Sequence, residues 1–249
     1  MLQGKFALVT GAAGAIGSAV AARLAAAGAD VAVNHFGTPG AAENTAARIR
    51  AMGRRAIIIE ADIGDEPSVE AMFSAMDREF GRLDILVNNA GVARSEDIFD
   101  TTLEYWNQVL RANLTGPFLC CRAAMFRMRA QGSGRIVNMG SVVGHQGALK
   151  GHVPYGASKA GLHGLTRTLA RTGARLGITV NAVAPGIVDT PMLSATHGES
   201  GIAELRKLVP LDDLIRPDEV AEAVLYLCSD AARMVTGAVL DINGGIMMR

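Results

Sequence analysis

The stretch "KFALVTGAAGAIGSAVAARLAAAG", residues 5–28, decides the fold. It begins with an apolar run that predicts a buried strand, and it ends with an Ala-rich segment that predicts a helix stopping at Gly28. Between them lies the glycine-rich turn "TGAAGAIG", residues 10–17. Glycine permits a tight turn and close approach of the backbone to a pyrophosphate, which a helix N-terminus also attracts. This order predicts a nucleotide site, with a plain tight turn as the alternative.

Short apolar runs alternate with longer Ala-rich segments along the rest of the chain. Nearly continuous apolar strands are typical of a parallel sheet with helices on both faces. We therefore expect one α/β domain over residues 1–249, with a Rossmann-type doubly wound parallel sheet of about seven strands. The predicted strands are residues 5–10, 30–35, 55–60, 83–88, 135–140, 178–183 and 238–242. Residues 189–210 are rich in Gly and Ser, and we expect an irregular segment that serves as a substrate-binding lid.

Composition excludes several classes of function. Of the 249 residues, 24 are Lys or Arg and 24 are Asp or Glu, so no broad basic surface for nucleic acid is expected. No apolar run of about 18 residues predicts a membrane span. The first residues lack a signal-peptide pattern, and the three cysteines are an odd number without zinc spacing. We expect a cytoplasmic protein with buried free thiols, no metal site and a small-molecule substrate.

The end of the second predicted strand bears on the choice of cofactor. An acidic residue there would bind the ribose hydroxyls of NAD and repel a 2′-phosphate. The sequence "VNHFG", residues 33–37, has Asn34 and His35 instead, so we expect NADP(H) to be favoured, with NAD(H) as the alternative. His35 is a candidate phosphate contact. Asp62 is a candidate acceptor for the adenine amino group, unless it only forms a turn or a helix cap.

The pair Tyr155 and Lys159 carries the predicted chemistry. Residues four apart lie on one face of a helix, and an ammonium group within about 4–6 Å favours a phenolate. Lowering the pKa of a tyrosine from about 10 to near neutrality needs about 4 kcal/mol. Such a tyrosine can move a proton to or from an alcohol oxygen. Ser141, after the strand ending in "NMGS", can donate to that oxygen, and Asn113 can hold a water that links Lys159 to bulk solvent.

The chain resembles the short-chain dehydrogenase/reductase family over essentially its whole length. The resemblance rests on "TGAAGAIG", "NNAG" at 88–91, Asn113, Ser141, "YGASK" at 155–159, "APGIVDTPM" at 184–192 and the segment 214–245, all in the family's order. It implies that Tyr155 is the general acid/base, that Lys159 lowers its pKa, that Ser141 orients the substrate carbonyl and that Asn113 supports a proton relay. The cofactor residues that we expect are Gly11, Ala13, Ile16, Gly17, Asn34, His35, Asp62, Ile63, Asn89, Ala90, Gly91, Tyr155, Lys159, Pro185, Gly186, Ile187 and Thr190.

The sequence departs from the family pattern in two places. The family's usual TGxxxGxG has glycine where this chain has Ala15, and Gly14 stands one position earlier. The separation of Ser141 and Tyr155 is 155 − 141 = 14 residues, one longer than is commonest in the family, and the extra residue falls within "HQGALKGHVP". We expect the first departure to be tolerated and the second to affect substrate specificity.

The substrate is the least determined property. Ser141, Gln146 and Tyr155 are the expected substrate contacts, and His145 and His152 are further candidates, because such groups bind hydroxyls of a sugar or polyol. Each is equally explained as a loop residue facing water. "VNHFG" also resembles some 3-oxoacyl-carrier-protein reductases, for which Arg127 and Arg129 would be docking cations. Two alternatives therefore stand beside a general carbonyl/alcohol oxidoreductase: an NAD-dependent sugar or polyol dehydrogenase, and a non-catalytic nucleotide-binding regulator.

Two predicted helices have apolar residues on more than one side. They are "GPFLCCRAAMFRMRA", residues 116–130, and "GLHGLTRTLART", residues 161–172. A helix with this pattern needs more than one partner. Burial within one subunit would satisfy it, but the family resemblance implies a homotetramer or homodimer.

Overall fold

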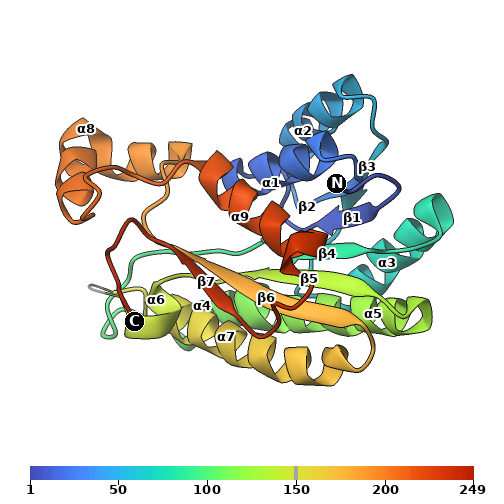
Figure 1. The fold of residues 1–249 in the computed structure, drawn as a ribbon. Helices are drawn as coiled ribbons and strands as arrows, with labels where there is room; N and C mark the ends of the chain where they lie inside the picture. The colour runs from blue at the N-terminus through green and yellow to red at the C-terminus, as the bar shows by residue number, and fades with distance from the viewer. Residues whose placement is uncertain (149–150) are drawn as a thin grey trace.

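A computed structural model describes residues 1–148 and 151–249, and it shows a seven-stranded sheet with helices on both faces (Figure 1). The strand order is β3-β2-β1-β4-β5-β6-β7, and every neighbouring pair is parallel. The predicted fold class is confirmed. The strands are β1 (Phe6–Val9), β2 (Asp30–His35), β3 (Ala56–Glu60), β4 (Ile85–Asn88), β5 (Gly134–Met139), β6 (Ile178–Pro185) and β7 (Val239–Ile242).

Two apolar cores separate the sheet from its helices. On one face pack α1 (Ala15–Ala26), α2 (Pro39–Ala51) and α9 (Pro217–Cys228), and on the other α3 (Glu66–Phe80), α5 (Gly116–Gln131) and α7 (Val153–Ala174). The strands β2, β4 and β6 are buried along their whole length, which explains their continuous apolar sequence. The three cysteines are free and buried, as expected.

The remaining elements lie at the edges of these layers. They are α4 (Leu103–Leu110), the π-helix η1 (Arg111–Thr115), α6 (Val143–Gln146), α8 (Pro191–Lys207) and the 3₁₀ helix η2 (Asp230–Ala232). Among the described residues, no helix is both long and apolar enough to cross a membrane.

The segment 189–210 differs from its expected irregular form. Most of it is α8, which projects from the sheet beyond α9 in Figure 1. Pro191 begins this helix and the Thr190 hydroxyl accepts a hydrogen bond from Leu193 N. Gly198 has φ 61° and ψ 179° and breaks the helix into two parts. A glycine at this break therefore produces a kinked helix and not a loop.

The winding of the chain reverses at β1. From β1 the chain moves outward through β2 and β3, and it then returns to β4 on the other side of β1. In open parallel sheets, ligands bind at the carboxyl ends of the strands beside such a switch point. The loops that follow β1, β2 and β4 are therefore the first place to look for a site.

Candidate active site

A cleft of about 750 Å³ opens at this switch point. Its walls come from the loops after β1, β2, β3 and β4 and from α7. The expected cofactor residues that line it are Gly11, Ala13, Ile16, Gly17, Asn34, His35, Asp62, Ile63, Asn89, Ala90, Gly91, Tyr155, Lys159 and Thr190. The expected residues outside its lining are Asn113, Ser141, Gln146, Pro185, Gly186 and Ile187. The fold thus brings most of the predicted set into one cavity.

The turn after β1 requires glycine at two positions. Gly11 has φ +62°, and a Cβ there would lie 2.8 Å from Ala90 Cα. At Gly17 a Cβ would lie 2.5 Å from Asn89 Nδ2. Asn89 Nδ2 donates to Thr10 O at 3.0 Å and to Gly11 O at 3.1 Å, so the turn after β4 is tied directly to the glycine turn. Only glycine fits this close approach of two backbones.

The departure at Ala15 has a structural explanation. Ala15 is the first residue of α1, and Gly14 precedes it with φ −79° and ψ 165°, a conformation open to any residue. A Cβ on Gly14 would lie 3.5 Å from Gly11 O, which is an ordinary contact. No side-chain hydrogen bond caps this helix, so its N-terminal N–H groups face the cleft without a competing side chain. The cradle fits a dinucleotide pyrophosphate.

Asn34 is committed to the fold. The residue is 1% exposed, its Oδ1 accepts from Gly11 N at 3.2 Å, and its Nδ2 donates to the carbonyls of His35, Ile59 and Ala61 at 3.3, 3.3 and 3.1 Å. This amide therefore joins β2, β3 and the glycine turn. Although Asn34 borders the cleft, its polar atoms are all engaged within the protein. Its expected contact with the cofactor stays a prediction.

The turn that follows β2 forms the far end of the cleft. His35 is buried and its Nδ1 accepts from Thr38 N at 3.3 Å, while Phe36 is 67% exposed at the rim. Glu60 Oε1 accepts from Gly37 N at 3.2 Å, so a carboxylate stands against this turn from the end of β3. The sequence reasoning missed Phe36, Thr38 and Glu60. The only feature of the sequence that could have identified these residues is their position at or just after the ends of two predicted strands.

Asp62 is engaged by its neighbours. Its Oδ1 accepts from Gly64 N at 2.9 Å, and its Oδ2 pairs with the guanidinium of Arg111 on η1. The turn interpretation is therefore correct for one oxygen. The carboxylate still borders the cleft, where its expected contact with an adenine amino group stays a prediction.

Tyr155 and Lys159 lie on one face of α7, as their spacing predicts. Lys159 Nζ is 5.4 Å from the centre of the Tyr155 ring and donates to Met139 O at 2.7 Å. Ser141 hydrogen-bonds to the Tyr155 hydroxyl. The end of β5 supplies the carbonyl that holds the lysine, and the segment just after β5 supplies the serine that holds the phenol.

The ionisation of this pair differs from the expectation. Burial raises the pKa of Tyr155, and the hydrogen bond with Ser141 opposes that rise. Burial also lowers the pKa of Lys159 to about 8. The lysine therefore does not by itself produce a phenolate, because burial disfavours the charged form of both groups. The phenol holds its proton near neutral pH.

Asn113 lies at the centre of the π-helix η1. It is fully buried, its Oδ1 accepts from Val92 N at 2.8 Å, and its Nδ2 donates to Val92 O at 2.9 Å and to Ser158 Oγ at 3.3 Å. π-helical turns occur frequently at functional sites. Here the wide turn lets one side chain clasp the segment after β4. The amide that we expected to hold a relay water is thus bonded to protein atoms, and its part in a relay stays a prediction.

Several other predicted residues lie away from the cleft. Gly186 N donates to Ile242 O at 2.9 Å and Ile187 O accepts from Ile215 N at 3.0 Å, so the segment after Pro185 packs toward β7 and α9. Gln146 is exposed at the end of α6, and part of the loop with the extra residue, at 149–150, lies outside the described residues. The cleft-lining residues that the sequence reasoning omitted are Gly14, Ala15, Phe36, Thr38, Ala61, Val92, Ala93, Ala112, Met139 and Pro191.

Comparisons with known proteins agree with this architecture. A family model described as Enoyl-(Acyl carrier protein) reductase matches residues 11–247. The cis-4-hydroxycyclohexanecarboxylate dehydrogenase of Sinomonas cyclohexanicum is 42% identical over 97% of this chain and 96% of its own length. The D-threitol dehydrogenase of Mycolicibacterium smegmatis is 42% identical over 100% and 95%.

A further relative is the 3-oxoacyl-[acyl-carrier-protein] reductase of Synechocystis sp., which is 40% identical over 99% of this chain and 98% of its own. The crystal structure of a putative short-chain alcohol dehydrogenase from Sinorhizobium meliloti 1021 superposes with a TM-score of 0.93 at 37% identity, covering 98% of this chain and 97% of that one. These matches span the whole sheet and the cleft. This chain therefore belongs to the short-chain dehydrogenase/reductase family of oxidoreductases, whose members use NAD(H) or NADP(H).

Proposed function

We propose that this protein interconverts a carbonyl and a secondary alcohol, with Tyr155 as general acid/base. One observation carries the proposal: the Tyr155 hydroxyl is bonded to Ser141 and stands beside buried Lys159 in a cleft with a phosphate-binding turn. When bound, the nicotinamide cofactor supplies or accepts the hydride. Ser141 donates to the substrate oxygen, and Lys159 holds the nicotinamide ribose. Tyr155 gives the proton to that oxygen in reduction and takes it in oxidation.

The protonation state of the site favours reduction near neutral pH. A phenol with a raised pKa carries its proton at pH 7 and can donate it to a developing alkoxide. In oxidation the same phenol must first lose that proton, which needs higher pH or a second positive charge nearby. We therefore expect carbonyl reduction to be faster than alcohol oxidation at pH 7, and oxidation to increase as pH rises.

NADP(H) remains the favoured cofactor, because no free carboxylate ends β2. The NAD(H) alternative is favoured by one specific feature, the Glu60 carboxylate against Gly37 N. A carboxylate there is placed to repel a 2′-phosphate or to accept from a ribose hydroxyl. This alternative pairs with a polyol dehydrogenase, as the D-threitol relative suggests.

For the substrate, His152 and Gln146 are the polar candidates. The His152 ring lies 6.1 Å from the Tyr155 ring in an edge arrangement, and Gln146 is exposed nearby along the chain. His145 lies beside Asp241 and His163, and its expected substrate contact stays a prediction. Arg127 is paired with Asp77 at 2.6 Å and lies over the Phe73 ring, and its expected role as a docking cation stays a prediction.

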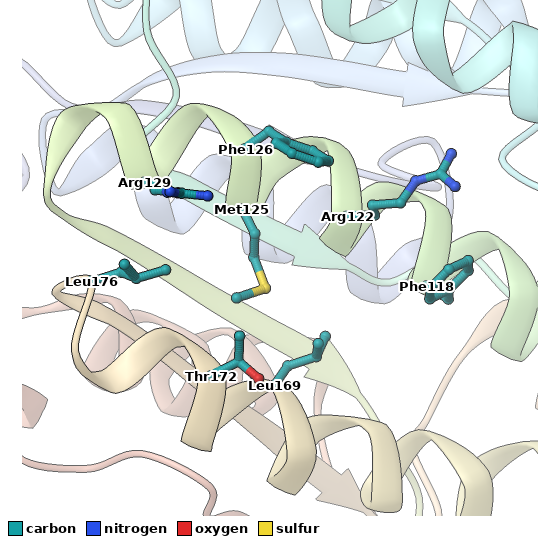
Figure 2. A pocket seen from close by; sticks show the side chains of 8 residues that line it. All are labelled: Phe118, Arg122, Met125, Phe126, Arg129, Leu169, Thr172 and Leu176. Carbon is teal, nitrogen blue, oxygen red and sulfur yellow. The ribbon is translucent and has the colours of Figure 1, made fainter.

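We also propose that the protein is a homodimer or homotetramer that associates through α5 and α7. An apolar groove of about 230 Å³ lies between these helices. Figure 2 shows the side chains that line it. Phe126, 68% exposed, lies along its edge with Arg122 and Arg129. A second copy would cover this groove and bury the second apolar side that the sequence of both helices shows.

The predicted cytoplasmic location accords with three unpaired thiols.

The first experiment is a fluorescence titration of the purified protein with NADPH and with NADH. It is followed by a ketone and polyol panel on wild type and Tyr155→Phe. We expect tight binding of one cofactor and turnover that the substitution abolishes without loss of cofactor binding. Binding of neither cofactor would contradict the proposal. Cofactor binding without any turnover would favour the regulator alternative.

A further inference from the structure

A pair of histidines, one buried and one partly buried, lies behind the segment that carries Ser141. His145 on α6 and His163 on α7 stack with ring centroids 4.3 Å apart, and α6 lies against α7 (Figure 1). His163 is 2% exposed and sits one turn beyond Lys159. Among the described residues, neither of its ring nitrogens has a hydrogen-bond partner. A buried ring without polar partners costs stability, so its presence here calls for a reason.

The shape of the Ser141 segment depends on the His163 ring. A Cβ on Gly140 would lie 2.5 Å from His163 Nε2, and a Cβ on Gly144 would lie 2.7 Å from His163 Cε1. The ring therefore touches the backbone on both sides of Ser141, at two positions where a hydrogen atom is the only side chain that fits. Its volume fixes how far this segment stands from α7, and hence from Tyr155.

The second histidine links the same segment to β7. His145 Nε2 lies 3.2 Å from Asp241 Oδ1, although the angle is not that of a hydrogen bond. Asp241 Oδ2 in turn accepts from Arg249 Nε at 2.7 Å, and Arg249 Nη2 donates to Val239 O at 2.5 Å. α6 is thus held between a carboxylate on one side and the His163 ring on the other.

Burial, with the charges around the pair, keeps both rings neutral. Burial is the main cause that lowers the pKa of His163 to about 4, and His145, Arg167, Lys159 and Arg249 lower it further. Burial also lowers the pKa of His145, assisted by Arg249 and Arg167 and opposed by Asp241. Near neutral pH the pair is therefore a stack of uncharged rings, which is suited to packing and not to proton transfer.

We propose that His163 and His145, anchored on Asp241, are positioning residues that hold Ser141 against the Tyr155 hydroxyl. The inference rests on the proposed function, because it assigns these residues to the same acid/base pair. Neither ring needs to touch the substrate or the cofactor. Their contribution is to fix the hydrogen bond between Ser141 and Tyr155, which lowers the pKa of Tyr155.

The test compares His163→Ala with His163→Leu, which refills the space. One readout needs no turnover: amide hydrogen exchange of residues 140–146. The other is the pH profile of alcohol oxidation. We expect His163→Ala to accelerate exchange in this segment at least tenfold. We also expect it to raise the apparent pKa of oxidation by about 1, because a hydrogen bond to the phenolate is lost. His163→Leu restores both properties toward wild type.

Two controls separate positioning from general destabilisation. Met72→Ala empties a buried site of α3 on another part of the core, so it should lower the Tm without moving either readout. If His163→Ala does not fold, Asp241→Asn replaces it, because Asp241 is 25% exposed. Asp77→Asn is its control, since that carboxylate also pairs with an arginine, at 2.6 Å. Asp241→Asn should move both readouts in the same direction as His163→Ala, and Asp77→Asn should move neither.

The outcomes are distinct. The inference is overturned, whether or not the enzyme is active, if hydrogen exchange over residues 140–146 is unchanged in His163→Ala. The same holds for Asp241→Asn if that variant is used because His163→Ala does not fold. An active variant whose rate falls while its apparent pKa stays at the wild-type value also overturns it, because that is a purely structural effect. A wild type without activity refutes the proposed function, and the exchange measurement then decides the inference alone.

Discussion

Replacing Asn34 by Asp tests how the end of β2 is built. An acid there is the usual NAD-selecting residue, so sequence reasoning alone expects a gain of NADH binding. The structure predicts the opposite. The Asn34 Nδ2 donates to three carbonyl oxygens at 3.1–3.3 Å in a site that is 1% exposed. A carboxylate oxygen in the same place faces three acceptors with no proton to offer.

The expected loss of folding stability in Asn34→Asp depends on whether the new carboxyl group is protonated or ionised. Keeping it neutral at pH 7, against an ordinary pKa of about 3.9, costs roughly 4 kcal/mol. Leaving it ionised costs a similar amount, about 3–5 kcal/mol, as an unpaired buried charge. A protonated Asp also restores only one of the three hydrogen bonds, which adds about 2 kcal/mol. The form with the lower cost sets the loss of stability, and we therefore expect about 3–5 kcal/mol, a large part of the whole stability of many domains.

The assay is urea unfolding of Asn34→Asp at pH 7 and pH 5, beside Asn44→Asp. Asn44 is exposed on α2, so its substitution changes the net charge equally without burial. The native-state pKa of the new Asp is raised, so its penalty is present at pH 7 and shrinks as pH falls toward the unfolded value. An Asn34→Asp protein as stable as Asn44→Asp, with improved NADH affinity, would refute this account of β2.

Three further predictions concern the turn, the lysine and the groove. Gly17→Ala places a Cβ 2.5 Å from Asn89 Nδ2 and should weaken cofactor binding by about 10- to 100-fold in a titration, for about 1–3 kcal/mol of overpacking. Gly14→Ala, with its nearest contact at 3.5 Å, should bind as wild type, and equal effects of the two would contradict the turn geometry. Burial lowers the pKa of Lys159 from 10.5 to about 8. Between these two pH values the lysine is protonated in the unfolded chain but not in the folded protein. The stability of the wild type should therefore rise by roughly 3 kcal/mol as pH increases from 8 to 10.5. Lys159→Met should lack this rise in unfolding curves collected from pH 7 to 10.5; a parallel pH dependence in both proteins would contradict the lowered pKa of Lys159. Phe126→Asp should dissociate the oligomer in sedimentation experiments, whereas Met52→Asp, at a 45% exposed position of the α2 terminus, should not. Wild type that sediments as a monomer would remove the groove from consideration as an interface.

The sequence predicted what depends on local pattern. Apolar runs and glycine positions identified all seven strands, the turn at Gly11 and Gly17, and the shared helix face of Tyr155 and Lys159. These features follow from periodicity and from steric limits of single residues. The alternation of strands and helices predicted a parallel, doubly wound sheet, but the order of its strands comes from the structure.

The rest depends on where side chains point after packing. Asn34 reads as a strand-end residue near a ligand, yet its amide turns inward because three carbonyls there need a donor. His145 reads as a polar loop residue, yet it stacks on His163, which is eighteen positions along the chain and on another helix. The pKa of Tyr155 likewise depends on burial that a spacing of four residues does not reveal.

The π-helix η1 also limits where insertions and deletions can occur in this chain. It joins α4 and α5 into one continuous helical segment over residues 103–131, with Asn113 in the π-helical turn and Phe126 in the last turns of α5. Removing one residue from residues 111–115 would rotate everything beyond it by about 100°. Asn113 would lose Val92, or Phe126 would leave the groove. Deletions and insertions that surface loops accept should therefore be absent from this segment in functional variants of the protein.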